Sequence, residues 1–203
     1  MKVLIACEES QTVCKEFRKL GHEAYSCDIM ECSGGHPEWH IKGDVREVLD
    51  QQWDMIIAHP ECTYIANSGV HCLHKDPTRW SKLDKACEFF NLFLNHPCPR
   101  ICIENPVPHK YAIERFHNNL KYTHTIQPWQ FGEDASKRTC LWLKGLPNLM
   151  PTNIIRKKIY ANQTPSGQNN LGPSPERKKL RSKTYTGIAK AMAEQWGTST
   201  KDR

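Results

Sequence analysis

Residues 53–64, Trp-Asp-Met-Ile-Ile-Ala-His-Pro-Glu-Cys-Thr-Tyr, decide the fold class. The run from Trp53 to Ala58 is short and strongly apolar, which is typical of a strand buried on both faces. Pro60 has no backbone N–H and restricts the residue before it, so the chain leaves this strand abruptly and without a helix. The stretch therefore predicts a central strand that ends in a polar loop carrying Cys62.

Short apolar runs alternate with helical patterns on both sides of this stretch. Residues 3–6 and 23–27 predict strands, and between them the apolar spacing predicts a helix over residues 10–20. A further helix is expected from Asp76-Pro77, because aspartate caps a helix well and proline suits its first position. A strand over residues 101–103 follows. This alternation predicts an α/β fold with a mainly parallel sheet flanked by helices.

The second half of the chain is less regular. Strands are expected at residues 123–126 and 139–143, and a final amphipathic helix at residues 185–196. Residues 144–183 are rich in Pro, Gly, Asn and basic side chains, so they predict a basic, irregular insertion. At 203 residues the chain fits one domain, residues 1–203, with a full hydrophobic core.

The composition bears on location and redox state. No apolar run approaches the roughly 18 residues that suggest a membrane span, and the N-terminus predicts a strand rather than a signal peptide. We therefore expect a cytoplasmic protein with no membrane partner. Several of the ten cysteines lie inside apolar runs, as Cys27, Cys102 and Cys140 do. Reduced, free thiols are the better interpretation of that pattern.

The positive charge is concentrated in the last third of the chain. Residues 137–190 contain twelve Lys and Arg and one acid, a net of +11, which leaves −5 for the rest of a chain whose total is +6. Such a distribution favours an anionic partner, above all nucleic acid. A solvated surface with a basic bias is the alternative.

Four polar segments follow predicted strands, where ligands bind in open α/β sheets. They are Cys7-Glu8, Asp28, residues 59–63 and Glu104-Asn105-Pro106. Asp28, after the second strand, suits the two hydroxyls of a ribose, although it could equally cap the next turn.

Cys62 and Glu104 are the candidates for chemistry. A thiol held at the sheet edge with a lowered pKa can act as a nucleophile, although Cys62 could also be one unremarkable thiol of ten. Glu104 follows an apolar strand, and a partly buried carboxyl with a raised pKa can donate a proton. The alternative for Glu104 is a salt-bridged structural acid. The spacing of histidines and cysteines over residues 59–74 fits no common zinc pattern, so we expect no metal site.

Taken in order, these residues resemble the core of the cytosine-C5 DNA methyltransferase family, and the chain is similar to small, phage-type proteins of that kind. Pro60-Glu61-Cys62-Thr63, with Asn67-Ser68-Gly69 downstream, resembles the nucleophile loop Pro-Pro-Cys-Gln…Ser-x-x-Gly. Glu104-Asn105-Pro106 resembles the Glu-Asn-Val motif. Phe131-Gly132, followed by Lys137-Arg138, resembles the Tyr-Gly…Arg-x-Arg segment, and residues 186–193 resemble the closing helix.

The resemblance implies a Rossmann-like fold that uses S-adenosylmethionine, and it assigns roles. The thiolate of Cys62 would add to cytosine C6, and Glu104 would hydrogen-bond or protonate N3. C5 would then accept the methyl group, and in duplex DNA the base would first be flipped out of the stack. Lys137 or Arg138 would hold the cytosine O2 or a phosphate.

The resemblance also implies binding residues. The cofactor set is Cys7, Glu8, Asp28, Ile29, Asp44, His59 and Pro60. The nucleic-acid set is Asn67, Ser68, Arg156, Lys157, Lys158, Arg177, Lys178, Lys179 and Arg181. The chain departs from the family in three places. Its first loop lacks glycine, and a strict alignment puts Lys137 and Thr139 at the two arginine positions of the Arg-x-Arg segment. Residues 144–183 are also short for a target-recognition domain. Glu8 and Glu9 in that first loop could repel the cofactor's carboxylate or accept from its ammonium group.

The sequence therefore predicts methyl transfer to cytosine C5, in DNA with relaxed specificity, by a monomer or small homo-oligomer. If a phage encodes the chain, the compartment would be the host cytoplasm. Two alternatives stay open. One is methylation of a free pyrimidine nucleotide, and the other is a non-catalytic protein that kept the fold and binds nucleic acid or another partner.

Overall fold

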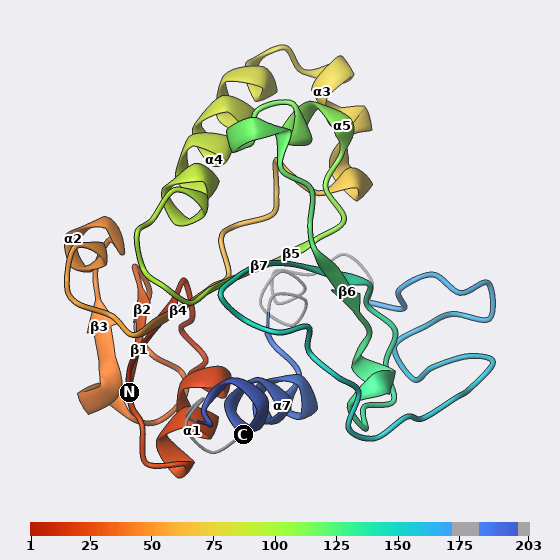
Figure 1. Cartoon of the computed structure of the whole chain (residues 1–203). Coiled ribbons are helices and arrows are strands. Elements are labelled where there is room, and N and C mark those ends of the chain that lie inside the picture. Colours follow the sequence, from red (N-terminus) through yellow and green to blue (C-terminus); the bar gives the residue numbers. More distant parts are fainter. Residues whose placement is uncertain (172–182, 199–203) are drawn as a thin grey trace.

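A seven-stranded sheet forms the centre of the molecule in the computed structural model, which describes residues 1–171 and 183–198 (Figure 1). The strand order is β3-β2-β1-β4-β5-β7-β6. The strands are β1 (Lys2–Ala6), β2 (Glu23–Asp28), β3 (His40–Lys42), β4 (Met55–Ala58), β5 (Ile101–Pro106), β6 (His124–Ile126) and β7 (Thr139–Lys144). The five strands from β3 to β5 are parallel, and β7 runs antiparallel to both of its neighbours. The predicted mainly parallel α/β sheet is confirmed.

Helices cover both faces of this sheet. Figure 1 shows α1 (Thr12–Lys19) and α7 (Thr186–Trp196) on one side, and α4 (Thr78–Leu94) with the short α3 (His71–Lys75) and α5 (Lys110–Ile113) on the other. The remaining short elements are α2 (Arg46–Leu49) and the 3-10 turns η1 (Pro37–Trp39), η2 (Asn67–Gly69), η3 (His117–Asn119) and η4 (Pro128–Gln130).

The alternation of side chains along the central strands divides the core into two layers. Successive residues of a strand point to opposite faces, so Leu4 and Ile56 join the cluster under α4, whereas Ile5 and Ile57 join the cluster under α1 and α7. All four side chains are fully buried. Strands buried on both faces explain why the sequence shows continuous apolar runs here rather than an alternating pattern.

Most element positions were predicted correctly, and the differences have local causes. Helix α1 begins at Thr12 rather than residue 10, because Gln11 adopts a left-handed conformation with φ of 55°. Strand β5 continues to Pro106 because β7 pairs with it along its whole length. The expectation that Glu104 follows the end of its strand is therefore wrong, since Glu104 lies inside β5. The elements β3, α3 and α5 are too short to show a periodicity and were not predicted.

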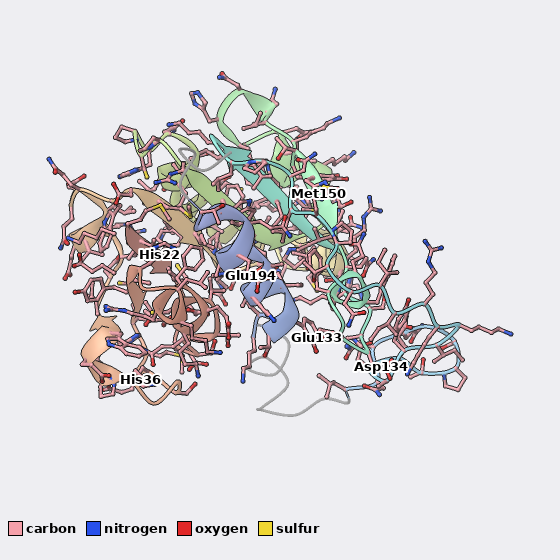
Figure 2. All side chains as sticks on the ribbon, turned by 60° about the horizontal axis from the view of Figure 1, so that its bottom comes forward. His22, His36, Glu133, Asp134, Met150 and Glu194 are labelled. Atoms are coloured by element: carbon pink, nitrogen blue, oxygen red, sulfur yellow. The ribbon has the colours of Figure 1, made fainter. Side chains whose placement is uncertain are left out.

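The basic insertion is held to the body by side-chain contacts. Residue 144, where the insertion was expected to begin, is the last residue of β7, and residues 145–171 contain no helix and none of the seven strands. Gln195 of α7 donates to and accepts from the backbone of Met150, each at 2.8 Å. Lys157 forms an ion pair with Asp134, which Figure 2 shows at the base of these loops. Arg177, Lys178, Lys179 and Arg181 lie outside the described residues.

The cysteines and the helices bear on two expectations. None of the ten cysteines is in a disulfide, and Cys27, Cys102 and Cys140 are buried as predicted. No helix in the described part of the chain is long and apolar enough to cross a membrane.

Gly187 provides a test of the packing between α7 and the segment before β7. Its backbone N–H donates to Glu133, which Figure 2 shows beside the start of α7, and an added Cβ would lie 2.0 Å from the carbonyl oxygen of Phe131. We expect Gly187→Ala to lower the free energy of unfolding by about 2 kcal/mol, although alanine favours helices. Gly43→Ala, where the nearest atom would be 3.5 Å away, should change it by less than about 0.5 kcal/mol. Urea unfolding of both variants measures the difference, and equal effects would contradict this packing.

Candidate active site

Three neighbouring strands place buried titratable side chains at one edge of the sheet. Strands β1, β4 and β5 are adjacent and parallel, so their carboxyl ends share an edge. Glu8 follows β1 and His59 follows β4, whereas Glu104 lies in the second half of β5. The backbone N–H of His59 donates to the carbonyl of Ala6 at 2.9 Å, which fixes the start of the Cys62 loop to β1.

His59 and Glu104 form the central contact of this edge. The Nδ1 atom of His59 lies 2.9 Å from Oε2 of Glu104, and the two side chains are only 9% and 10% exposed. A charged hydrogen bond with so little solvent around it is stronger than one on the surface. The contact joins the nucleophile loop after β4 to the acid on β5.

The environment of Glu104 overturns one expectation. Burial raises the pKa of its carboxyl, but the charge of Lys137, the hydrogen bond and charge of His59, and a hydrogen bond from Thr139 together hold that pKa below its usual value. The prediction of a raised pKa was therefore wrong. Glu104 is an ionised carboxylate near neutral pH, so it accepts hydrogen bonds and holds no proton of its own.

The structure separates the two predicted cations. Lys137 lines a small cavity together with Glu104 and Thr139, whereas Arg138 is exposed. The other lining residues are Thr184, Tyr185 and Ile188, at the start of the last helix. Lys137 and Thr139, the pair given by strict alignment, are thus the two that meet Glu104. The sequence did not point to Thr184 or Tyr185, because their relation to Glu104 depends on how α7 packs.

The loop that carries Cys62 is held at several points. The carbonyl of Cys62 accepts from the backbone N–H groups of Ile65 and Ala66, at 3.0 and 2.9 Å, which closes a tight turn around the partly buried thiol. Asn105 Nδ2 donates to the carbonyl of Pro60 at 2.7 Å. Glu104 and Asn105 therefore fix the loop at two successive residues, His59 and Pro60.

Buried polar atoms without a partner gather around the same loop. Within the described residues there are three, namely His59 Nε2, Arg79 Nε and Asn105 Oδ1. Arg79 donates to the carbonyl of Thr63, so all three side chains belong to or contact residues 59–64. Buried polar groups are nearly always paired, so this clustering marks the place where a polar ligand would add hydrogen bonds.

The loop after β1 achieves its tight path without glycine. Cys7 and Gln11 have φ of 60° and 55°, in the left-handed region that glycine usually occupies. Such strain in non-glycine residues is typical of functional loops. Glu8 accepts from the backbone N–H groups of Val13 and Cys14, at 2.7 and 3.2 Å. Its carboxylate is buried against the positive end of α1 and does not face the outside of the loop.

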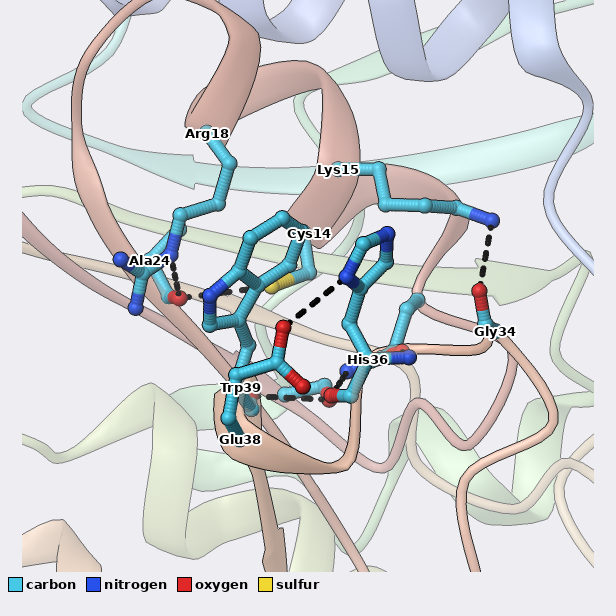
Figure 3. Close-up of polar contacts among 10 residues, drawn as sticks. Cys14, Lys15, Arg18, Ala24, Gly34, His36, Glu38 and Trp39 are labelled. Carbon is cyan, nitrogen blue, oxygen red and sulfur yellow. Dashed lines mark hydrogen bonds and ion pairs between the residues drawn. The ribbon is translucent and has the colours of Figure 1, made fainter.

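Gln11 fastens this loop to the segment after β2. Its side chain donates to the carbonyl of His36 at 2.7 Å and accepts from the N–H of His36 at 3.0 Å. Figure 3 shows Lys15 reaching the carbonyl of Gly34 and His36 stacked on Trp39. At Gly34 an added Cβ would lie 2.4 Å from the Cβ of Gln11, so only glycine fits this approach.

The predicted cofactor acids lie near each other at the ends of β2 and β3. The charges of Asp28 and Asp44 both contribute to raising the pKa of Cys7, after burial, so both are close to that thiol. Asp28 accepts from the N–H of Met30 at 2.9 Å, and Asp44 forms an ion pair with Arg46. Asp28 thus caps the next turn, as the alternative interpretation held. Ile29, beside it, has 74% of its surface exposed.

The predicted nucleic-acid residues fall in two places. Asn67 and Ser68 are exposed in η2, directly after the Cys62 loop. Arg156 and Lys158 are exposed on the insertion, while Lys157 between them is paired with Asp134. No group of three metal-binding side chains gathers in the part of the chain that the structure describes.

Comparison with solved structures bears on the fold. No model of a known protein family matches the chain, and no curated protein sequence matches it. A putative DNA modification methyltransferase from an E. coli prophage superposes with a TM-score of 0.51 at 15% sequence identity, over 75% of this chain and 51% of that one. The chain has the Rossmann-like methyltransferase fold.

A methyltransferase from Entamoeba histolytica superposes with a TM-score of 0.49 at 15% identity, over 77% of this chain and 56% of that one. The chain thus spans little more than half the length of either structure. The predicted fold class is confirmed, whereas the reaction and the substrate are matters for proposal.

The lowered pKa of Glu104 predicts how stability depends on pH. A carboxyl whose pKa is lower in the folded than in the unfolded state stabilises the fold above its usual value of 4.5, and this contribution is lost as the pH falls through the folded value. We expect Glu104→Gln to flatten the loss of stability below pH 4.5, relative to the native chain. Glu88→Gln, at an exposed position of α4, should not. Urea unfolding over a pH series measures both slopes. A native-like acid slope in Glu104→Gln would show that His59 and Lys137 do not stabilise the carboxylate.

Proposed function

We propose that the protein transfers a methyl group from S-adenosylmethionine to C5 of cytosine, in DNA with relaxed sequence specificity. The observation that carries this proposal is the joining of the Cys62 loop to Glu104 at one strand edge, through His59 and Asn105. A nucleophile and a carboxylate held by the same two strands can act on opposite parts of one flat base. The methyltransferase fold supports the choice of reaction class.

The side chains suit the polar edge of cytosine. The Cys62 thiolate would form a bond to C6, which ends the aromaticity of the ring and makes C5 nucleophilic. The Glu104 carboxylate would accept a hydrogen bond from the exocyclic amino group, and Lys137, beside it, would donate to O2 or to a phosphate. These contacts orient the base and stabilise the charge that thiolate addition creates.

The residues at the ends of β1 and β2 fit the methyl donor. The carboxylate of Asp28 keeps one oxygen beyond its turn contact that can accept from a ribose hydroxyl, and Ile29 presents an exposed apolar surface to an adenine ring. The left-handed backbone at Cys7 and Gln11 lets the chain pass close to a bound molecule. S-adenosylmethionine supplies an electrophilic methyl group when bound, and Asp28, Ile29, Asp44 and the Cys7 loop would hold it. Pro60, at the start of the Cys62 loop, would border it.

A free pyrimidine nucleotide is the second candidate substrate. The described residues of the insertion, 145–171, form no helix or strand of the sheet, so they offer little rigid surface to read a base sequence. The exposed Arg156 and Lys158 favour a polyanion instead.

Methyl transfer with a matched pair of cysteine variants tests the reaction. Radiolabelled S-adenosylmethionine is offered with DNA and with dCMP in parallel. We expect label in DNA, and we expect Cys62→Ser to lower the rate by about a thousandfold or more, because a hydroxyl is a far weaker nucleophile than a thiolate. Cys72→Ser, at another partly buried thiol, should stay near the native rate. Label in dCMP alone would select the second candidate, and transfer that survives Cys62→Ser would refute the assignment of the nucleophile.

Charge reversal on the insertion tests the DNA interface. We expect Arg156→Glu with Lys158→Glu to weaken DNA binding and to reduce the slope of log K against log salt by about 2, because each lost phosphate contact removes about one unit. Lys19→Glu with Lys85→Glu, at positions on α1 and α4, is the charge-matched control. Fluorescence anisotropy over a salt series measures both slopes. A native slope in the insertion variant, or an equal change in the control, would show that the insertion is only solvated surface.

A further inference from the structure

His59 occupies a different role from the one its sequence position suggests. The resemblance placed it among the cofactor-binding residues, but its imidazole lies against Glu104. The side chain is 9% exposed, and its Nδ1 atom lies within hydrogen-bond distance of Oε2 of Glu104. A histidine buried on a carboxylate is one of the few arrangements in which a protein stores a proton that can move near neutral pH.

Two carboxyl groups face this imidazole from the strands on either side. The charge of His59 lowers the pKa of Glu104 from β5 and opposes the burial that raises the pKa of Glu8 beyond β1. Both oxygens of Glu8 are engaged by backbone N–H groups of α1, so Glu8 contributes charge without contacting the ring. Two cations act on these carboxyl groups, Lys137 on Glu104 and Lys15 on Glu8. The proton of His59 therefore has one direct acceptor, Oε2 of Glu104.

We propose that His59 and Glu104 share one proton, which His59 holds at rest and which passes through Glu104 to the ring nitrogen N3 of the pyrimidine. This proposal rests on the proposed function and assigns His59 as the positioning residue of that reaction. The proton from His59 is needed because Glu104 is ionised, and a carboxylate without a proton cannot neutralise N3. The unpartnered Nε2 atom leaves the ring free to be neutral or charged without breaking a second hydrogen bond.

The step balances without a further reactant. The thiolate sulfur of Cys62 gives its electron pair to C6, and the electrons of the ring move toward N3 and C5. Oε2 of Glu104 takes the proton from His59 Nδ1, and the neutral carboxyl group so formed turns and gives that same proton to N3. The imidazolium becomes neutral imidazole, Glu104 ends as it began, and the base is protonated once. When the thiolate leaves C6, the proton returns from N3 to His59 by the same route.

Exchange of the C5 hydrogen tests this step without the methyl donor. Once Cys62 has added to C6, C5 can take a deuteron from D2O, and loss of its original proton leaves deuterated cytosine. The rate is measured against pH by mass spectrometry of the DNA. The acid limb of the profile reports the Cys62 thiol, and the alkaline limb reports loss of the shared proton.

His59→Gln is the test variant, because glutamine can donate a hydrogen bond to Glu104 but has no proton to transfer. We expect its exchange rate to fall about tenfold or more at pH 8 and to approach the native rate near pH 6, with the acid limb unmoved. His109→Gln is the matched control, since His109 is also largely buried and contacts the carbonyl of Tyr64 in the same loop, but forms no hydrogen bond with a carboxylate. Its alkaline limb should stay where it is in the native chain.

An alkaline limb that stays in place in His59→Gln, or that moves as far in His109→Gln, would overturn the proposal. A titration of 15N-labelled histidine by NMR decides it if His59→Gln does not fold. We expect Glu104→Gln to shift the His59 titration to lower pH, and an unchanged titration would contradict the shared proton. Absence of both exchange and methyl transfer in the native chain would refute the proposed function instead, and the NMR titration would still decide whether the pair shares a proton.

Discussion

The contact between His59 and Glu104 is the interaction on which the site depends, because this buried hydrogen bond joins the loop after β4 to β5. A buried carboxylate is costly unless it is paired, and His59, Lys137 and Thr139 together meet that requirement for Glu104. The same pairing fixes where the Cys62 loop leaves β4. Nucleophile and acid are therefore positioned by one feature of the sheet.

The loop after β1 follows a tight path although it contains no glycine. A carboxylate, that of Glu8, covers the positive end of α1, where phosphate groups sit in dinucleotide-binding folds. The left-handed Cys7 and Gln11 take the conformations that glycine would supply, and the side chain of Gln11 ties the loop to His36. The lack of glycine in this loop is thus compatible with a tight, well-anchored backbone.

The sequence predicted the parts of the fold that depend on local pattern. Continuous apolar runs identified β1, β4 and the start of β5, because both faces of these strands are buried. The length of β5 was not predictable, since its last three residues pair with β7, more than thirty residues later. For the same reason the strand-end position and the raised pKa expected for Glu104 were wrong, since Lys137 lies just before β7 and Thr139 is its first residue. The role of Asp28 as a turn cap had been foreseen only as an alternative. His59 was singled out by its place after a strand, but its partner depended on the strand order.

Binding of S-adenosylmethionine tests the central claim most directly, namely that this strand edge is a methyl-transfer site. Isothermal titration calorimetry of the native chain should show saturable binding at one site. Asp28→Asn should weaken it about tenfold or more, because a ribose hydroxyl loses a charged acceptor. Asp54→Asn, at the opposite end of the sheet where Asp54 accepts from the N–H of Lys2, should leave the affinity unchanged. No binding by the native chain, or equal weakening by the two variants, would contradict the account.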